Sequence, residues 1–361
     1  MAKRSGQDVS ETIANKMSQI SDTIKGLDTE ISSVDAELES LLLWVPNMAM
    51  EDVPEGDETC NKIIRSWGEP KKHDFPAKPH WELGENLGIF ELQRGSKIAG
   101  SGFPMFKGLG ARLERGLLNF MLDTQRGNGY EEVATPYVVN RKTITGTGQL
   151  PKLENDMYYI SNDGFFLIPT SEVPLVNFYQ DEIIPGEKLP IKITSATPCF
   201  RREAGAYGKD TRGILRVHQF NKVELIQFVE EEKSNEALEN LLGHAESILQ
   251  KLGLAYRIVM LATGDLSFAS AKTYDIELWA PGVDKWLEVS SCSNCTDFQA
   301  RRANIKYKFK GGKTKFVHTL NGSGVATPRL VVSILETYQQ ADGHVQVPAA
   351  LVPYLGGVEV I

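Results

Sequence analysis

The chain has 361 residues, of which 41% are hydrophobic and 24% charged, and its formal net charge at pH 7 is -8. This composition is that of a globular protein with one large catalytic domain and an appendage, or with two ordinary domains, and the acidic balance argues against a protein that coats nucleic acid non-specifically. No apolar run is long enough to cross a bilayer, no signal peptide opens the chain, and four cysteines make no disulfide framework, so we expect no membrane and a cytoplasmic location.

A long amphipathic helix is predicted over residues 11–41. Its apolar residues recur with alternating steps of four and three, at Ile13, Met17, Ile20, Ile24, Leu27, Ile31, Val34, Leu38 and Leu41. This spacing is the a/d seam of a coiled coil, which must be buried against another surface. No second helix of this kind follows, so the partner is either another chain or a segment that this sequence lacks.

A connector rich in proline and glycine follows over residues 46–84, and the rest has the composition of a mixed domain. The other predicted elements are helices over residues 109–124, 230–252 and 324–340, and strands over residues 130–135, 274–279, 286–290 and 316–320. Since helices and strands do not alternate strictly, we predict an α+β fold with an antiparallel sheet rather than a doubly wound sheet.

Residues 194–224 are predicted to form two strands joined by a long polar loop, made mobile by Gly205, Gly208 and Gly213. Six cations lie between positions 201 and 222, against Glu203 and Asp210, and they are Arg201, Arg202, Lys209, Arg212, Arg216 and Lys222. Because the planar fork of arginine matches phosphate oxygens, such a hairpin suits a polyphosphate, and a solvated surface hairpin is the alternative. A P-loop is excluded. The segment K-G-G-K-T (310–314) would need a glycine at position 307, and this chain has Tyr307 there.

Several segments, taken together and in order, carry a family resemblance. The hairpin containing F-R-R-E (200–203) and R-V-H-Q-F (216–220) resembles motif 2 of class II aminoacyl-tRNA synthetases. The helix and strand that end at Pro136 resemble motif 1, and H-T-L-N-G-S-G-V-A-T-P-R (318–329) resembles motif 3. The segments T-G-T-G-Q-L-P-K (145–152), L-I-P-T-S-E-V-P-L (167–175), G-I-L-R-V-H-Q-F-N-K-V-E-L (213–225) and S-S-C-S-N-C-T-D-F-Q-A-R-R (290–302) are similar to bacterial-type seryl-tRNA synthetases.

This resemblance implies a class II synthetase-type antiparallel sheet flanked by helices. Residues 1–45 would be a single long helix, the remnant of a coiled-coil arm, and residues 46–361 the catalytic domain. The implied activity is ATP-dependent activation of L-serine to seryl-adenylate and transfer to tRNA(Ser), in a homodimer formed through the motif 1 helix and strand.

The resemblance also implies roles for individual residues at the ATP site. Arg201 would hold the α-phosphate, Glu203 would read the adenine amino group, Phe220 would stack on adenine, and Arg329 would cover its other face and the γ-phosphate. The implied ATP-binding set is Arg201, Arg202, Glu203, Val217, Phe220, Glu288, Val289, Ser290, Ser291 and Arg329, with Arg201 and Arg329 as the catalytic residues. An aromatic residue at a strand end is more often part of the core, which is the alternative for Phe220.

Glu288 and Ser291 match the family's metal positions and would hold Mg²⁺ together with ATP, because one or two oxygen ligands plus phosphates suit that ion.

The implied serine site consists of Thr170, Ser171, Glu172, Glu224, Asn321 and Ser323. Such a site, which hydrogen-bonds a hydroxyl, strongly rejects an analogue without it. For Glu224 the alternative is an ion pair with Lys222 or a neighbour. Cys292 and Cys295 lack a second pair, so no structural zinc is expected.

One departure from the family concerns the arm. Family members usually begin with a two-helix arm that grips the tRNA, and this sequence supplies only the second helix. Truncation and natural lack of the arm both stay open, as does tRNA binding.

Two other functions also stay open. A paralogue that loads a small amino acid onto a carrier protein would hold zinc through a Cys near the position of Thr170. A non-catalytic regulatory homologue would have lost one of Arg201, Glu203, Glu288 or Arg329, and all four are present.

Overall fold

The computed structural model describes residues 2–204 and 212–361, and for residues 2–12 it describes the backbone only. Gly205, Gly208, Lys209 and Asp210 of the predicted loop therefore lie outside the described residues. The chain divides into two compact units, Met1–Pro46 and Asn47–Ile361. Within the described ranges, no helix combines the length and hydrophobicity needed to span a bilayer.

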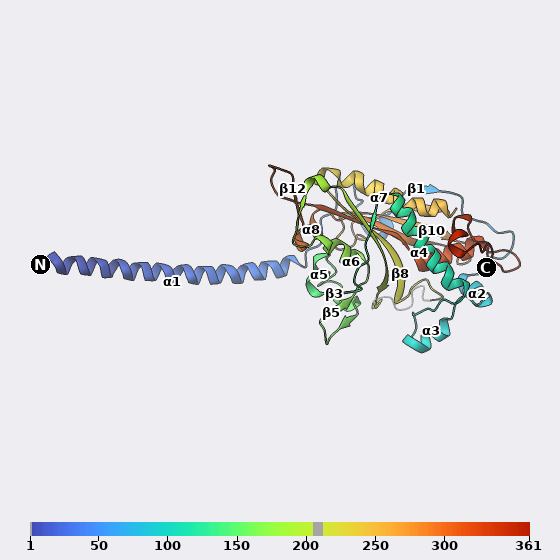
Figure 1. Ribbon diagram of the computed structural model, residues 1–361, viewed down its shortest axis with the longest axis horizontal. Coiled ribbons are helices and arrows are strands. Elements are labelled where there is room, and N and C mark those ends of the chain that lie inside the picture. Colours follow the sequence, from blue (N-terminus) through green and yellow to red (C-terminus); the bar gives the residue numbers. More distant parts are fainter. Residues whose placement is uncertain (1, 205–211) are drawn as a thin grey trace. The chain divides into compact units, whose positions relative to one another are not determined.

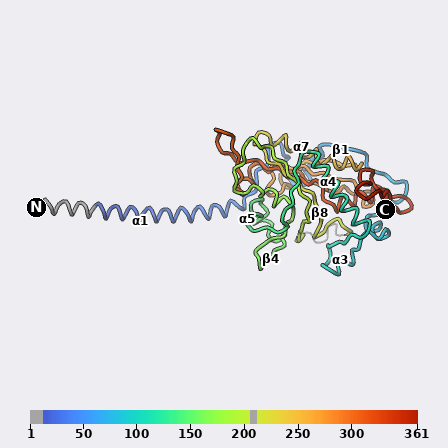
Figure 2. Tube along the Cα trace, in the orientation of Figure 1, coloured from blue at the N-terminus to red at the C-terminus, as the bar shows by residue number. Residues whose placement is uncertain are grey.

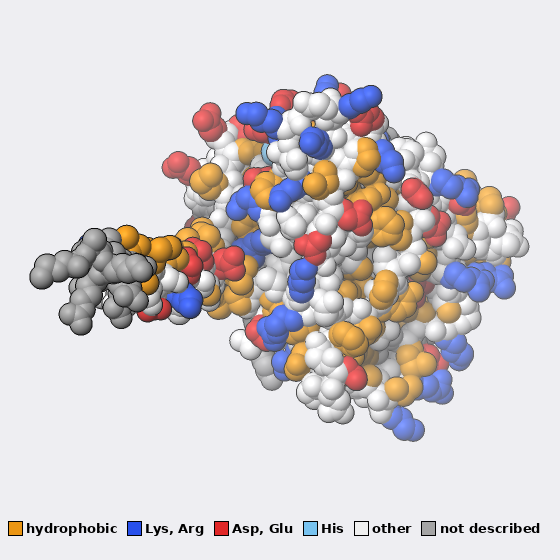
Figure 3. Space-filling view, turned by 60° about the vertical axis from the view of Figure 1, so that its left-hand side comes forward, with side chains coloured by type: hydrophobic (Ala, Val, Ile, Leu, Met, Phe, Trp, Pro, Cys, Tyr) orange, Lys and Arg blue, Asp and Glu red, His pale blue; other side chains and the backbone are white. Residues whose placement is uncertain are grey.

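The first unit consists mainly of helix α1 (Ala2–Leu42; Figures 1 and 3). The predicted helix is thus confirmed and begins earlier than its apolar stripe. Every residue of that stripe, from Ile13 to Leu41, is at least 51% exposed. The heptad seam therefore remains uncovered in the single chain.

A central sheet of eight strands organises the second unit, in the order β1-β9-β10-β11-β14-β8-β7-β2. The strands are β1 (Lys62–Trp67), β2 (Glu131–Glu132), β7 (Ile191–Phe200), β8 (Gln219–Val229), β9 (Tyr256–Met260), β10 (Lys272–Ala280), β11 (Lys285–Asn294) and β14 (His318–Ala326). Neighbouring strands are antiparallel except β2, which pairs parallel with β7. The predicted antiparallel α+β architecture is confirmed.

Strand β8 separates two cores, because successive side chains of a strand point to opposite faces. Val223 and Leu225 belong to the larger core and Ile226 and Phe228 to a second one. Helices α4 (Leu109–Gly127), α7 (Ser234–Lys251) and α9 (Thr327–Tyr338) supply the larger core, and α6 (Glu172–Val176) and α8 (Phe298–Ala303) the second. Figure 2 follows the trace through these layers.

Smaller elements surround this sheet. They are helices α2 (His80–Asn86), α3 (Leu92–Ala99) and α5 (Arg141–Gly146), and strands β3 (Val138–Asn140), β4 (Tyr159–Ile160), β5 (Phe165–Leu167), β6 (Ile183–Pro185), β12 (Lys306–Lys308) and β13 (Lys315–Phe316). Strands β3, β5 and β4 form a three-stranded sheet over a separate apolar cluster that includes Ile144 and Phe166. The residues directly after β5 begin the segment that reaches the candidate site.

The boundaries predicted for three strands and for the final helix were wrong. The strand expected over residues 130–135 is reduced to Glu131–Glu132, because it lies at the sheet edge and pairs only with Ile193 and Thr194. The strand expected over 286–290 continues to Asn294. The strand expected over 316–320 is split at Val317 and its second part runs to Ala326, so the final helix begins at Thr327 rather than at 324.

Candidate active site

A cavity of about 810 Å³ opens beside strands β8, β11 and β14. Its walls also include segments 147–149 and 169–172 and residues 267–269. The lining contains these sequence-predicted site residues: Thr170, Glu172, Arg201, Glu203, Val217, Phe220, Glu224, Glu288, Val289, Ser290, Ser291, Asn321, Ser323 and Arg329. Two predicted residues are not in the lining, since Arg202 is exposed and Ser171 is fully buried.

Two arginines, Arg201 and Arg329, line this cavity. The guanidinium of Arg201 lies 5.2 Å from the centre of the Phe220 ring, and its Nε donates to the Pro169 carbonyl at 3.3 Å. Arg329 donates through Nη1 to the Glu288 carbonyl at 2.7 Å. Arg201 beside the aromatic face of Phe220 makes this part of the cavity suitable for an aromatic ring that carries phosphates.

Glu203 follows Arg201 in an unusual backbone conformation. Its φ is 52°, in the left-handed region that a non-glycine residue rarely adopts, and its carboxylate forms an ion pair with Arg216 at 2.5 Å. Such strain is typical of residues that a functional site holds in one orientation. The ion pair fixes the carboxylate at the edge of the cavity.

Oxygen ligands gather on strands β10 and β11. Asp275 is directly opposite Ser291 in the strand register. In the described part of the chain, the buried Oδ1 of Asp275 has no hydrogen-bond partner. Burial, and next the charge of Glu288, raises the pKa of Asp275 well above its usual value. No three side chains of His, Cys, Asp or Glu form a metal cluster among the described residues, so ligation by Glu288 and Ser291 stays a prediction.

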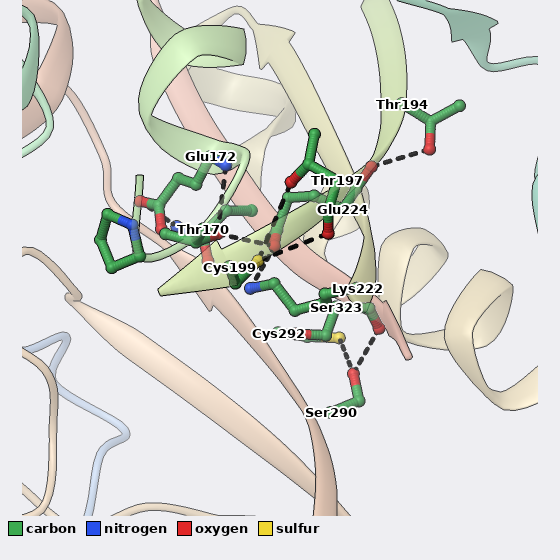
Figure 4. A network of polar contacts seen from close by, with 12 residues as sticks. Thr170, Glu172, Thr194, Thr197, Cys199, Lys222, Glu224, Ser290, Cys292 and Ser323 are labelled. Carbon is green, nitrogen blue, oxygen red and sulfur yellow. Dashed lines mark hydrogen bonds and ion pairs between the residues drawn. The ribbon is translucent and has the colours of Figure 1, made fainter. Parts of the chain in front are cut away.

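Two carboxylates that line the cavity, Glu172 and Glu224, belong to one network of polar contacts (Figure 4). Glu224 is 1% exposed, forms an ion pair with Lys222 and accepts a hydrogen bond from Thr170 Oγ1 at 3.0 Å. The ion pair with Lys222 is therefore present, and contact of Glu224 with a substrate hydroxyl stays a prediction for a residue that lines the cavity.

Glu172 accepts two hydrogen bonds on Oε1, from Gln299 Nε2 at 2.6 Å and from Asn321 Nδ2 at 3.1 Å. Burial, and next the charge of Glu224, raises the pKa of Glu172 to about 7. Two neighbouring carboxylates surrounded by hydroxyl and amide groups make a pocket for a small cation that carries hydrogen-bonding groups.

Some lining residues were not predicted from the sequence. Lys222 was considered as one cation of the hairpin and as a partner of Glu224, and it also lines the cavity itself. Asp156 also lines it, and its Oδ1 accepts from the amide of Ala204 at 2.9 Å. Gln299, which holds Glu172, lies inside the quoted segment 290–302 and could have been found there. Nothing in the sequence near Asp156 indicates its position.

Cys292 and Cys295, the two cysteines of the C-x-x-C segment, are buried free thiols. Cys295 accepts a hydrogen bond from Asn321 Nδ2 at 3.4 Å, and burial raises the pKa of the Cys295 thiol well above its usual value. A thiol that stays protonated is a poor metal ligand. Cys295 contacts Asn321, a residue that lines the cavity, so this thiol is part of the packing around the site.

Comparison with known proteins identifies close relatives. Residues 156–338 match the family model of the tRNA synthetase class II core domain (G, H, P, S and T). The serine--tRNA ligase of Nitratidesulfovibrio vulgaris is 52% identical over 99% of this chain and 85% of its own length. The seryl-tRNA synthetase of Pyrococcus horikoshii complexed with ATP superposes with a TM-score of 0.91 at 38% identity, covering 94% of this chain and 80% of that one. The cytoplasmic serine-tRNA ligase of Naegleria fowleri in complex with AMP has a TM-score of 0.88 at 35% identity, covering 94% and 81%.

Proposed function

The chain belongs to the serine--tRNA ligase family of class II aminoacyl-tRNA synthetases, and we propose that its cavity beside β8, β11 and β14 is the active site. As a serine--tRNA ligase it activates L-serine with ATP and transfers the seryl group to tRNA. One observation carries the assignment of the site: a single cavity is lined both by Arg201 and Arg329 and by Thr170, Glu172 and Glu224.

The nucleotide takes the end with the two arginines. Phe220 stacks on adenine, Arg201 contacts the α-phosphate and Arg329 the γ-phosphate, while Glu203 accepts from the adenine amino group. The remaining ATP-binding positions are Arg202, Val217, Glu288, Val289, Ser290 and Ser291. The exposed side chain of Arg202 would have to turn toward the cavity to take part.

Serine takes the end with the buried carboxylates. Its ammonium group is placed against Thr170 and Glu172, with Ser171 supporting that turn from the core, and its hydroxyl against Glu224 and Ser323, with Asn321 nearby. The lone pairs of Glu224 that Lys222 and Thr170 leave free accept the substrate hydroxyl. An analogue without the hydroxyl leaves this buried carboxylate incompletely paired, which disfavours it.

Activation needs no protein nucleophile. A serine carboxylate oxygen forms a bond to the α-phosphorus of ATP, and the bond from that phosphorus to the bridging oxygen breaks, so that pyrophosphate leaves. Arg201 and Arg329 hold the reacting groups in line and neutralise charge that grows on the phosphoryl oxygens.

A magnesium ion fits the oxygen ligands at the ATP end. Glu288 and Ser291 offer hard oxygen ligands, and the unpaired buried oxygen of Asp275 lies on the neighbouring strand. Bound there with ATP, Mg²⁺ would neutralise phosphate charge. No structural zinc is proposed.

Three further proposals concern organisation. The chain would form a homodimer through α4 and β2, since β2 is a two-residue edge strand that hydrogen-bonds only to β7 in the described sheet. Residues 1–45 would form an arm that contacts tRNA(Ser), and residues 46–361 the catalytic domain. A cytoplasmic location is supported by the four free cysteines.

The two other functions considered from the sequence gain no support. The relatives compared above are named as serine or seryl enzymes, and none as a carrier-protein ligase or a regulatory protein. The position proposed for a zinc-binding cysteine in such paralogues lies near Thr170, a buried residue that here donates a hydrogen bond to Glu224.

The proposed site is tested by ATP–pyrophosphate exchange with a panel of amino acids. Arg201→Ala should reduce serine-dependent exchange by about 10²- to 10³-fold, because it removes a fixed charge at the reacting phosphate. The matched control is Arg94→Ala on α3, an exposed arginine outside the cavity, which should leave exchange unchanged. Substantial activity of the Arg201 variant would count against the site.

A further inference from the structure

His80 and Glu336 form a fully buried pair outside the lining of the cavity. His80 Nδ1 lies 2.8 Å from Glu336 Oε1, which also accepts from the His80 amide at 2.9 Å. Glu336 Oε2 accepts from the amides of Gly282 at 2.8 Å and Val283 at 3.1 Å. Both oxygens of the carboxylate are therefore satisfied, and its position is fixed by three backbone amides from two segments.

The second ring nitrogen of His80 holds the descending side of the motif 2 hairpin. The amide of Ile214 donates to His80 Nε2 at 3.2 Å. Because a backbone amide can only donate, Nε2 must carry a lone pair, and the proton that faces Glu336 is on Nδ1. Glu336 thus sets the tautomer of His80 that can accept from Ile214.

Gly213 gives independent support for this contact. Its φ is +70°, and a Cβ added there would lie 2.1 Å from His80 Nε2. Only glycine lets the backbone come this close to the imidazole in this conformation. The adjacent Arg212 lies over the ring of Trp81, 4.6 Å from its centre, so two consecutive residues of α2 hold this segment.

The contact continues to a residue of the active site. The carbonyl of Leu215, which follows Ile214, accepts from Arg329 Nε at 3.2 Å. Arg329 Nη1 donates in turn to the Glu288 carbonyl at 2.7 Å. His80 itself does not line the cavity. Its effect reaches the site through the backbone of residues 214–215.

We propose that His80 is a positioning residue that holds the Leu215 carbonyl, and through it Arg329, in the orientation that binds ATP. The proposal rests on the proposed function, in which Arg329 contacts the nucleotide. The serine end is held by other contacts, through Thr170, Gln299 and Asn321. Loss of the contact between His80 and Ile214 should therefore weaken ATP binding and leave serine binding unchanged.

Two substitutions separate the functions of the two ring nitrogens. His80→Gln keeps an acceptor near the place of Nε2, whereas His80→Asn keeps a donor near the place of Nδ1 and leaves the Ile214 amide without a partner. In ATP–pyrophosphate exchange, His80→Asn should raise KM for ATP about tenfold, the effect expected of one buried unsatisfied donor. His80→Gln should stay within about twofold, because Ile214 keeps its acceptor.

A second pair of variants tests the same contact from the other side. Gly213→Ala should reproduce the rise in KM for ATP, because its Cβ displaces the backbone from His80. Gly311→Ala is its matched control, since Gly311 has a similar φ of +75° with nothing within 4 Å of an added Cβ. This control should change neither KM.

The outcomes distinguish the proposal from a purely structural role and from failure of the proposed function. A specific rise in KM for ATP in His80→Asn and Gly213→Ala, with KM for serine unchanged, supports the proposal. If the variants change KM for ATP and KM for serine equally, or leave KM for ATP unchanged while the wild-type protein is active, His80 has no positioning role. In either case the proposed function still stands. A wild-type protein without serine-dependent exchange would overturn the proposed function as well.

Discussion

Lys222 and Glu224 form an ion pair inside the cavity, and their side chains are only 8% and 2% exposed. Glu172 is a second carboxylate close enough for the charge of Glu224 to raise its pKa. Lys222 compensates one of these two charges. Glu224 thus has a counter-charge in a buried place, and its oxygens can accept hydrogen bonds from a substrate.

Lys222→Met should be strongly destabilising, because it leaves Glu224 buried without its partner. Removing one member of a buried pair costs about 3–5 kcal/mol. Thermal unfolding should show a lower Tm, and KM for serine should rise at least about tenfold. The double variant with Glu224→Gln should recover much of the Tm without recovering serine-dependent exchange. An unchanged Tm in Lys222→Met would show that the pair does not compensate Glu224.

Serine binding should depend on pH through Glu172. With a pKa of about 7, this carboxyl is protonated below neutrality and ionised above it. The substrate ammonium requires the ionised form, so KM for serine should rise as pH falls below about 7, approaching about tenfold per pH unit. Its contribution to folding stability has the opposite trend, since a raised folded-state pKa means that stability is lost as pH rises through 7.

Measurement of KM for serine from pH 5.5 to 8 tests this prediction. Glu172→Gln is the control, because an amide does not titrate, and its remaining pH dependence reports the other groups. If the wild-type profile is as flat as that of the variant, titration of the Glu172 carboxyl does not control serine binding, and the prediction is wrong.

Local patterns predicted much of the fold. The apolar stripes of α4 and α7 and the ends of the β7–β8 hairpin lie where the sequence indicated. The run of β14 through Gly322 and Gly324 was missed, because glycine and small polar residues favour a turn locally. Pairing of Gly322 with Cys292 on β11 and with Leu225 on β8 keeps this segment extended instead. Such long-range pairing outweighs local preference.

The same contrast applies to the site. Residues in family motifs, such as Arg201 and Arg329, could be named from the sequence and line the cavity. Asp156 and His80 could not, since each acts through a backbone amide that lies far away in the sequence. A single histidine or aspartate has no local pattern that identifies its distant partner.

The requirement for magnesium should change when Glu288 is replaced. Glu288→Gln removes an anionic oxygen ligand, so the magnesium concentration for half-maximal exchange should rise about tenfold, as for loss of roughly one charge-assisted contact. Asp284→Asn is a matched control, because it removes a carboxylate from the turn of the same β10–β11 hairpin, and asparagine tolerates its positive φ of 54°. Equal magnesium dependence of both variants would exclude Glu288 as a ligand.

The exposed stripe on α1 should cause the chain to associate. Its apolar residues, each at least 51% exposed, form a continuous heptad seam, and a seam of this kind is stabilised by burial against a second helix. Sedimentation velocity should therefore detect assemblies larger than the proposed homodimer, in amounts that grow with protein concentration. Ile24→Lys combined with Leu27→Lys places charges in the seam and should remove these assemblies while pyrophosphate exchange stays unchanged. Thr29→Lys adds a charge to the opposite side of the same helix, where Thr29 bonds only to the Lys25 carbonyl, and should leave association as it is. If the seam variant associates like this control, the stripe is not the surface through which the chains meet.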